Sequence, residues 1–421
     1  MGGPASQLPR HRAVRISSII DFMRCNVSVD DALRIILSSV RSLPQESVPL
    51  LAALGRICSV TVKATTANPP HDNSAMDGYG VRAGDTANAP VTLPIAGTIF
   101  AGGPFRGRMQ AGRAVKIMTG AKIPPGVDAI VPFEEAREKE GRVLIARPAV
   151  RGTHIRRKGE DFRKGEVLIP KGRLIRPAEA AILSALGTTR IRVFRRPRVA
   201  VLATGDELVP ADRPLGRGRI RDSNSPALAA SVLQCGADPV LLGIGRDSVK
   251  HLKRKMAQGV KADALIMAGG VSAGEADYGR DALLSLGGRL LFFKVRQRPG
   301  HPLAFGRLRG RPVFILPGNP VSAMLTFQIY VRPALMAMRG ASPAAGTPIQ
   351  VELGEDVSGK AGRTEFLRVR LRERNGRRRA FLTGPQGSGI LTSMARADGY
   401  IVVPEDSDRL RKGSVLPVYP L

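Results

Sequence analysis

The stretch ALIMAGGVSAGEADY, residues 264–278, passes from an apolar run through paired glycines to two carboxylates. Similar apolar runs alternate with helical patterns between residues 196 and 340. This alternation predicts a parallel sheet wrapped by helices, a doubly wound α/β domain. Ligands of such sheets bind outside the carboxyl ends of the strands. The residues that follow each apolar run are therefore the first candidates for a functional site.

The alternation supplies specific elements. The predicted strands are RVAVLAT (198–204), PVLLG (239–243), ALIMA (264–268) and VFIL (313–316). The predicted helices are PALAASVLQCG (226–236), SVKHLKRKMAQ (248–258), DALLSL (281–286) and VSAMLTFQIYVRPALMAM (321–338). Three loops follow strands of this set, namely TGDEL (204–208), GGVSAGEAD (269–277) and LPGNP (316–320). We expect these loops to share one edge of the sheet.

The glycines of the central loop favour an oxyanion. Gly269, Gly270 and Gly274 allow close backbone approach and positive φ, so that N–H groups can face a phosphate, and Ser272 adds a hydroxyl.

Two carboxylates in the same loop, Glu275 and Asp277, would repel a phosphate unless a divalent cation lies between them. Mg²⁺ commonly bridges carboxylate and phosphate, which predicts a phosphoanhydride ligand with a metal ion. Asp247, in the turn GRDS, could add a further oxygen. The alternative is that these acids only stabilise helix N-termini.

A second cluster carries positive charge. RQRPGHP (296–302) places Arg298 and His301 around a Pro-Gly turn, with Lys294 just upstream. Fixed cations of this kind suit a tetrahedral or pyrophosphate-like oxyanion. In so basic a chain, solvated surface residues are the alternative.

The flanking regions have other patterns. Ser28 followed by acids begins a helical stripe, RPAEAAILSALG (176–187) is helical, and short apolar runs from 91 to 148 and after 340 indicate strands. The predicted domains are a basic disordered tail (1–26), a split helical and linker domain (27–66 and 162–195), a β insert (67–161), the α/β domain (196–340) and a C-terminal β-barrel (341–421).

Composition narrows the class of protein. The net charge of +30 would attract polyanions, but no nucleic-acid motif or aromatic stacking series accompanies the arginines, so nucleic acid is an unlikely partner. No apolar stretch approaches the roughly 18 residues of a membrane span. Cys25, Cys58 and Cys235 are far apart, which argues against disulfides and zinc sites and fits the cytoplasm. Walker A and HExxH motifs are absent from the sequence.

Ordered motifs give a resemblance. The chain resembles the molybdopterin molybdenumtransferases, the MoeA-type proteins related to the E domain of gephyrin, through HDNSAMDGYG (71–80), MTGAKIPPGVDAIVPFE (118–134), IRRKGED (155–161), TGDEL, AGGVSAGEADY, RPGHPLAFG and LPGNPVS. Taken alone, the first of these motifs could be a rigid turn and the third a charged turn.

The resemblance implies a four-domain fold, an elongated homodimer and a reaction in molybdenum cofactor biosynthesis. Adenylylated molybdopterin is hydrolysed with Mg²⁺, molybdate is inserted into its dithiolene, and AMP is released. A molybdopterin adenylyltransferase and molybdoenzyme maturation proteins are the expected partners, and no membrane is expected.

The implied site residues follow the motif positions. The catalytic set is Asp77, Thr119, Asp161, Glu207, Asp277 and Lys294, with the first three expected from the partner subunit. The substrate-binding set is Gly269, Gly270, Ser272, Gly274, Pro317, Gly318, Asn319 and Pro320. The metal set is Asp277, Glu207, Asp247 and Glu275, and the molybdate set is Arg298, His301, Ser322, Arg368 and Ser388.

The chain departs from the family where Arg298 and His301 replace the usual lysines. Arginine keeps its charge, but histidine is neutral for much of the time near pH 7, which leaves the preference for molybdate or tungstate open. Two other functions are weighed. A non-catalytic pterin carrier or scaffold would not need the acidic set, and a molybdopterin adenylyltransferase would not need the flanking domains.

Overall fold

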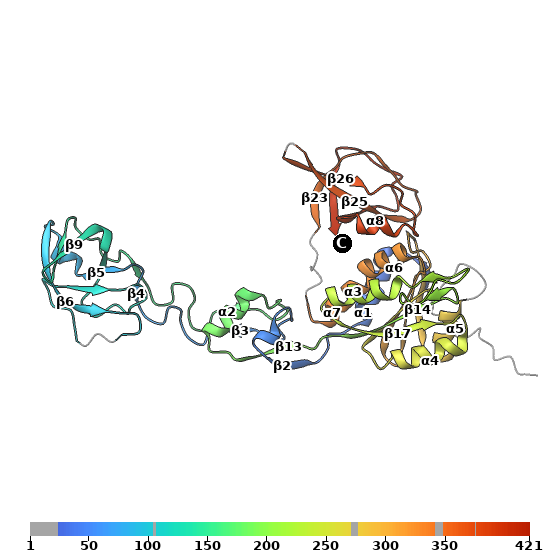
Figure 1. Ribbon diagram of the computed structural model, residues 1–421, viewed down its shortest axis with the longest axis horizontal. Coiled ribbons are helices and arrows are strands. Elements are labelled where there is room, and N and C mark those ends of the chain that lie inside the picture. Colours follow the sequence, from blue (N-terminus) through green and yellow to red (C-terminus); the bar gives the residue numbers. More distant parts are fainter. Residues whose placement is uncertain (1–23, 104–106, 271–276, 342–347, 375) are drawn as a thin grey trace, which may run out of the picture.

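The computed structural model describes residues 24–103, 107–270, 277–341, 348–374 and 376–421. The molecule is elongated, with the β insert at one end, the split domain in the middle, and the α/β domain and barrel at the other end (Figure 1). The predicted fold class is confirmed, since the chain combines an α/β domain with β domains.

The α/β domain has a seven-stranded sheet. Its order is β1 (Arg24–Val27), β19 (Arg289–Val295), β21 (Ala304–Leu308), β22 (Arg311–Leu316), β18 (Ala264–Ala268), β14 (Arg198–Thr204) and β17 (Asp238–Gly245). Neighbouring strands are parallel except for β21, which is antiparallel to both of its neighbours.

Helices cover both faces of this sheet. They are α1 (Val29–Ser39), α3 (Asn224–Gln234), α4 (Val249–Gly259), α5 (Tyr278–Ser285), α6 (Pro320–Thr326), the π-helix η6 (Phe327–Val331) and α7 (Arg332–Met338). Val199 and Val201 of β14 pack in one core with α1, α3, α6 and α7, whereas Ala200 and Leu202 pack in another with α4 and α5. Successive strand residues point to opposite faces, which makes the domain doubly wound.

The first helix belongs to the α/β domain, not to the split domain to which residues 27–66 were assigned. Ser28 caps α1 as predicted, accepting the N–H of Asp31. However, Ala32 and Ile36 are buried in the larger core of the α/β domain, and β1 extends its sheet. The apolar stripe of α1 finds its partner on α7 and β19, so the chain leaves this domain only after α1.

One helical segment corrects the expectation about apolar length. Pro320–Met338 is long and apolar enough for a membrane span, although no such stretch was expected. Two thirds of it (67%) is buried within the protein, and it forms the centre of the larger core. Burial of this kind is typical of the core helix of a globular domain.

The split domain consists mainly of paired strands. It contains β2 (Gln45–Pro49) with β13 (Arg190–Phe194), β3 (Val62–Lys63) with β12 (Val167–Ile169), the short helix η3 (Leu51–Ala53) and α2 (Pro177–Ala185). Helix α2 begins at Pro177 and ends before Gly187, whose φ is +72°. This proline start and glycine end were predicted, and the rest of the domain is less helical than expected.

The insert and the barrel are β structures. The insert has a sheet of β8 (Ala129–Pro132), β5 (Gly78–Val81), β7 (Ala114–Ile117), β6 (Val91–Ile99), β10 (Arg142–Ile145) and β9 (Ala136–Lys139), with β4 (Asn73–Ser74) paired to β11 (Ile155–Arg156) and the short helices η4 (Ala83–Thr86) and η5 (Phe133–Glu135). In the C-terminal region, β25 (Thr364–Arg374), β26 (Arg377–Leu382), β23 (Ile349–Leu353), β29 (Val415–Pro420) and β27 (Gly399–Val403) close a five-stranded barrel, because β27 also pairs with β25.

Smaller elements join these parts. They are β15 (Leu208–Val209) with β16 (Ile220–Arg221), β20 (Gln297–Arg298) paired to β25, β24 (Val357–Ser358) with β28 (Arg409–Leu410), and α8 (Leu391–Ala395). The β20–β25 pair matters most for the site, because it ties the Arg298 turn of the α/β domain to the barrel.

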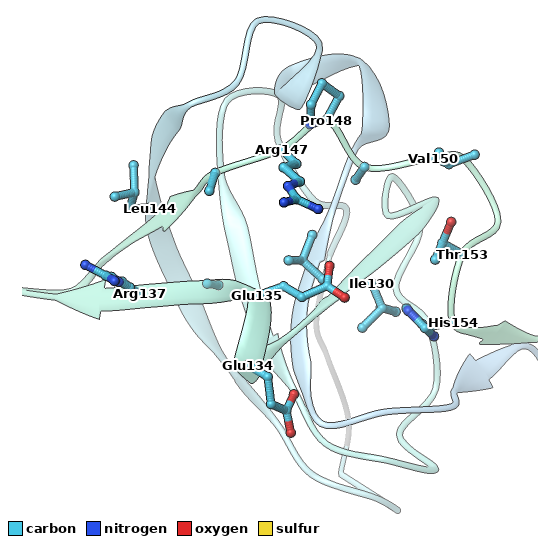
Figure 2. A pocket seen from close by; sticks show the side chains of 14 residues that line it. Ile130, Glu134, Glu135, Arg137, Leu144, Arg147, Pro148, Val150, Thr153 and His154 are labelled. Carbon is cyan, nitrogen blue, oxygen red and sulfur yellow. The ribbon is translucent and has the colours of Figure 1, made fainter.

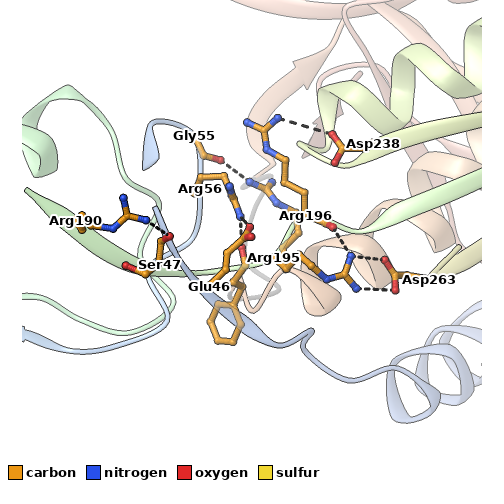
Figure 3. A network of polar contacts seen from close by, with 11 residues as sticks. Glu46, Ser47, Gly55, Arg56, Arg190, Arg195, Arg196, Asp238 and Asp263 are labelled. Carbon is orange, nitrogen blue, oxygen red and sulfur yellow. Dashed lines mark hydrogen bonds and ion pairs between the residues drawn. The ribbon is translucent and has the colours of Figure 1, made fainter. Parts of the chain in front are cut away.

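An ion-pair network joins the split domain to the α/β domain (Figure 3). Both carboxylate oxygens of buried Asp263 accept hydrogen bonds from Arg195, at 2.8 and 2.9 Å, and one also accepts the N–H of Arg198 at 2.9 Å. Nearby, the guanidinium of Arg339 donates to the carbonyls of Cys235 and Gly55, the second of which lies in the split domain. These contacts link the two domains where the chain crosses between them.

This junction gives a stability prediction. Burial disfavours ionisation of Asp263, but the hydrogen bonds from Arg195 and Arg198 outweigh it and lower its pKa. A lowered pKa stabilises the fold above the unfolded-state value, so the Asp263→Asn variant should lose about 2 kcal/mol at pH 7. The deficit should shrink as the pH falls below about 4. Urea unfolding at several pH values measures it.

The matched control is Asp238→Asn. Asp238 lies in the same junction but is half exposed, and its oxygen is 3.9 Å from Arg196. We expect its unfolding free energy to change by less than about 0.5 kcal/mol. An equal loss in both variants would contradict the assignment of the junction to Asp263.

Candidate functional site

The carboxyl ends of β14, β18 and β22 meet at one edge of the sheet, as predicted for their loops. The N–H of Gly269 donates to the carbonyl of Leu316 at 3.0 Å, which joins the second loop to the third. Gly269 has φ +95°, and a Cβ there would lie 2.6 Å from the carbonyl oxygen of Thr204 in the first loop. Only glycine fits, so the backbone itself lines this edge.

Four buried polar atoms at this edge lack a hydrogen-bond partner within the described part of the chain. They are Thr204 Oγ1, Asn224 Oδ1, Ser225 Oγ and Asp277 Oδ2. A buried polar atom without a partner costs about 1–3 kcal/mol, and native structures contain few. Their concentration at one edge indicates a surface built to be completed by a polar ligand.

The carboxylate of Asp277 is placed both to cap a helix and to bind a cation, the two roles that the sequence left open. Its Oδ1 caps α5 by accepting the N–H of Arg280 at 3.1 Å, as a helix N-terminal acid does. Its Oδ2 has no partner among the described residues, although Asp277 is only 3% exposed. Burial raises the pKa of Asp277, while the charges of Arg280 and Lys294 oppose that rise. One oxygen therefore serves the fold and the other is available to a cation.

The other acids of the metal set lie on exposed loops of the same domain. The N–H of Asp206 donates to Asp247 Oδ2 at 3.3 Å, so the loops after β14 and β17 are neighbours. Burial, with the charges of Asp206 and Glu207, raises the pKa of Asp247. No group of three His, Cys, Asp or Glu side chains within the described ranges could hold a metal ion. Glu275, Ser272 and Gly274 lie outside those ranges.

A Mg²⁺ ion nevertheless fits the donors present. Mg²⁺ in proteins commonly takes one or two carboxylates and completes its shell with substrate phosphates and water. Asp277 Oδ2 is a hard oxygen donor of that type without a partner of its own within the described chain. The carboxylates of the described residues alone would not make a complete cage here, so water and a substrate phosphate would supply the remaining ligands.

The LPGNP loop connects this edge to the barrel. The Asn224 amide at the start of α3 donates to the carbonyl of Gly318 at 2.8 Å. The Asn319 amide donates to Ser388 Oγ at 3.0 Å. Pro320 begins α6, and Pro317 is buried beside the loop. The loop thus lies between the candidate phosphate site at the sheet edge and the positively charged cluster at the barrel.

Arg368 is the centre of the positive cluster. It is fully buried, with Nε donating to Ser393 Oγ at 3.1 Å and Nη2 to the carbonyl of Gly387 at 3.3 Å, while Nη1 has no partner among the described residues. Desolvation, together with the charge of nearby Arg298, lowers its pKa to about 10. No carboxylate within the described part of the chain pairs with it. A buried guanidinium without a paired carboxylate would be stabilised by a bound anion.

The remaining members of the molybdate set surround this arginine unevenly. Arg298 is half exposed, and its Nη1 is 3.5 Å from buried Glu365. His301 is exposed, with its Nδ1 2.8 Å from the carbonyl oxygen of Val295. Ser322 is buried in the first turn of α6. Arg298, Arg368, Ser322 and Ser388 come from the α/β domain and barrel, so this cluster lies at their junction.

The insert residues lie far from this edge in the same chain (Figure 1). Asp77 accepts the N–H and the hydroxyl of Thr119 at 2.6 and 2.7 Å, and these bonds lower its pKa. Asp161 accepts the Asn68 amide at 2.9 Å and lines a 360 Å³ pocket with Asn73, whose Oδ1 is buried and unpaired. These residues cannot reach the edge of their own chain.

A further cavity does not belong to this edge. A 790 Å³ hollow lies in the insert, bordered by Glu134, Glu135, Arg137 and Arg147 among others (Figure 2). It contains none of the predicted site residues and none of the buried unpaired polar atoms. Its size alone therefore does not identify it as the functional site.

Sequence reasoning missed three of the polar residues at the edge. Thr204 was quoted in TGDEL but only Glu207 was selected, and Asn224 and Ser225 were not considered. A signal existed, because RDSNSP (221–226) is a polar run just before a helix that follows a buried strand. Helix starts at the carboxyl edge of such sheets are common ligand sites.

Comparisons with known proteins agree across the chain. Models of three families match, described as the MoeA N-terminal region (domain I and II) over residues 27–187, a probable molybdopterin binding domain over 200–337, and the MoeA C-terminal region (domain IV) over 350–421.

Individual proteins are similar over most of their length. "Molybdopterin molybdenumtransferase 2" of Mycobacterium tuberculosis is 37% identical over 404 residues, which cover 94% of this chain and 99% of that protein. "Molybdopterin molybdenumtransferase" of Nostoc sp. is 40% identical over 74% of each chain. The crystal structure of a molybdopterin biosynthesis moeA protein from Pyrococcus horikoshii OT3 is similar with a TM-score of 0.82 at 30% identity, covering 94% of this chain and all of that one.

The unpaired atoms give a prediction about stability. Thr204→Val removes a buried hydroxyl that has no partner in the described chain, so the unfolding free energy of the free protein should stay the same or rise. Thr326→Val removes a buried hydroxyl that donates to the carbonyl of Ser322 at 2.7 Å, and should lower that free energy by about 1 kcal/mol. Urea unfolding of the two variants makes the comparison. A larger loss for Thr204→Val would show that its hydroxyl is satisfied within the protein.

Proposed function

This chain belongs to the MoeA family of molybdopterin molybdenumtransferases, and we propose that it inserts molybdate into adenylylated molybdopterin and releases AMP. It is a transferase of molybdenum cofactor biosynthesis. In the proposed reaction, water cleaves the phosphoanhydride, and the dithiolene sulfurs of the pterin then bind molybdenum in place of oxygen. The observation that carries the proposal is the set of unpaired buried polar atoms around Asp277.

The carboxyl edge supplies the phosphate site. The backbone at Gly269 and Gly270 can approach a pyrophosphate closely, since both residues have positive φ and no side chain. Thr204, Asn224 and Ser225 supply further polar atoms without partners of their own in the described chain. Lys294 lies close enough to Asp277 to affect its pKa, so its ammonium can offset charge that develops on the phosphates.

Asp277 would hold Mg²⁺ through Oδ2, with help from Glu207 or Asp247 on the neighbouring loops. The ion, when bound, would neutralise the phosphoanhydride as a Lewis acid. Asp277 keeps its place during this work because its other oxygen is bonded to the α5 backbone. The raised pKa of Asp277 describes the free protein and would fall beside a cation.

The positive cluster supplies the molybdate site. Molybdate is a tetrahedral dianion, and Arg298 and Arg368 offer two guanidinium groups near each other at the barrel junction. Ser322 and Ser388 add hydroxyls at the same junction. His301 is exposed where the family has lysine, so the cradle relies on arginine more than the usual pattern does.

A second copy of the chain would complete the cleft. Asp77, Thr119 and Asp161 belong to the insert, which lies at the opposite end of the molecule from its own α/β domain (Figure 1). The split domain exposes apolar side chains that suit a dimer contact, namely Leu51, Leu54, Val167 and Leu174. Leu51 is 85% exposed. We therefore place the homodimer contact on the split domain, with one insert facing the partner's sheet edge.

The setting of the reaction follows from its substrate. An adenylylated pterin must come from a molybdopterin adenylyltransferase, and the finished cofactor must pass to molybdoenzymes or their maturation proteins. We expect these exchanges to take place in the cytoplasm.

The proposal predicts the behaviour of Asp277→Ala. With adenylylated molybdopterin, Mg²⁺ and molybdate, AMP release should fall at least about 100-fold, because the carboxylate aimed at the ligand is lost. Asp281→Ala is the matched control, since Asp281 lies in the same helix, is half exposed and pairs with Arg280. Its rate should match that of the parent protein. Retained turnover in Asp277→Ala, with the dimer folded, would overturn the assigned role.

The dimer proposal predicts complementation. Asp77→Ala and Asp277→Ala proteins should each be inactive, because each lacks one half of every site. Mixed under conditions that exchange subunits, they should recover roughly a quarter of the parent activity, since a heterodimer keeps one intact site. Recovery is measured as AMP released per protein. An Asp77→Ala protein with full activity would show that the insert takes no part.

A further inference from the structure

Two glutamines hold the backbone on which the two arginines of the positive cluster are mounted. The first, Gln297, is only 1% exposed. Its Nε2 donates to the carbonyls of Pro299 and Gly300 at 3.0 and 3.3 Å, on the far side of Arg298 in the same turn. Its Oε1 accepts the hydroxyl of Tyr330. The amide therefore has a partner on both its donor and its acceptor side.

The buried helical segment α6–η6 packs against this glutamine and its turn. Tyr330 is fully buried and belongs to η6, a π-helical segment, and such segments are often found at functional sites. A Cβ on Gly300 would lie 2.5 Å from Thr326 Cγ2 and 2.8 Å from Gln297 Nε2, so the turn packs directly on the helix. The position of Arg298 is thus set by the core and not by its own exposed side chain.

The second glutamine, Gln386, holds Arg368 in a similar way. Its Oε1 accepts the N–H of Arg368 at 2.9 Å, and its Nε2 donates to the carbonyl of Arg368 at 3.2 Å. The same Nε2 lies 3.0 Å from the carbonyl of Gly384 and 3.3 Å from Thr383 Oγ1. The hydroxyl oxygen of Ser393 accepts a hydrogen bond from Arg368 Nε. Backbone and guanidinium are both held, and within the described chain only Nη1 lacks a hydrogen-bond partner.

Holding two like charges near each other opposes folding. Burial, and to a smaller extent the charge of Arg298, lowers the pKa of Arg368, as expected for like charges held in one region of the protein. Each arginine would relieve the repulsion by turning away if its backbone could move. The hydrogen bonds of Gln297 and Gln386 restrain the backbone at each arginine, and an anion placed between the arginines would offset the repulsion.

We infer that Gln297 and Gln386 are positioning residues for the oxyanion, which keep Arg298 and Arg368 in a binding geometry before molybdate arrives. This inference rests on the proposed function. Neither glutamine needs to touch the anion. A preorganised cradle binds more tightly because ordering the two arginines no longer opposes binding.

The test uses near-isosteric substitutions that cannot form these hydrogen bonds, Gln297→Met and Gln386→Met. Each full-length variant is assayed for AMP release while molybdate and adenylylated molybdopterin are varied in turn. We expect the KM for molybdate to rise about tenfold or more, while the KM for the pterin and the kcat at saturating molybdate change less than about twofold. Equilibrium dialysis with molybdate alone should show the same loss of affinity.

Gln350→Met is the matched control, because Gln350 is exposed on β23 of the same barrel. Its constants should equal those of the parent protein. Tyr330→Phe is a second variant that tests the role of Gln297. It deletes only the hydroxyl that donates to Gln297 Oε1 and keeps the buried ring. It should raise the KM for molybdate about threefold even if Gln297→Met does not fold.

The possible results separate the two proposals. If the parent protein releases AMP but Gln386→Met and Tyr330→Phe keep its KM for molybdate, the positioning roles are wrong and the proposed function stands. If both variants raise the KM for the pterin as much as that for molybdate, they act on the fold in general and the inference is overturned. If the parent protein does not turn over the adenylylated pterin, the proposed function and the inference both fail.

Discussion

At the carboxyl edge of the α/β sheet, several buried polar atoms have no hydrogen-bond partner within the described chain. Much of the architecture follows from this constraint. Gly269 lies so close to the Thr204 backbone that no side chain can fill the space. Asp277 keeps one oxygen for its helix and one without a partner in the described chain. A fold carries such a cost where a bound ligand repays it. The same logic applies to buried Arg368, whose Nη1 is unpaired at the barrel junction.

The domain arrangement divides the proposed chemistry between two chains. The α/β domain and barrel bring the phosphate edge and the arginine pair together through the LPGNP loop, which Asn224 and Ser388 hold from either side. The insert carries its own acids at the opposite end of the molecule (Figure 1). The Asp263 network joins the α/β domain to the split domain, which lies between it and the insert (Figure 3). A rigid junction matters if the insert must reach a partner's site.

The sequence predicted those features that interactions between neighbouring residues decide, such as helix ends and strands. Ser28 as a helix cap, Pro177 and Gly187 as helix ends, and the strands before the site loops all appear in the structure. Helix α1 was assigned to the wrong domain because an amphipathic stripe does not reveal which core will bury it. Asn224 and Ser225 were missed because their meaning depends on tertiary burial. The clamps by Gln297 and Gln386 join residues whose pairing no local pattern predicts.

A crystal structure with adenylylated molybdopterin and Mn²⁺ in place of Mg²⁺ would test the central claim most directly. Anomalous scattering locates Mn²⁺ without ambiguity, and the pterin pyrophosphate would be visible beside it. Our account predicts the ion between Asp277 Oδ2 and the pyrophosphate, with Thr204, Asn224 and Ser225 bonded to the ligand. A pyrophosphate bound elsewhere, with Asp277 Oδ2 still unpaired and no ion within coordination distance, would contradict it.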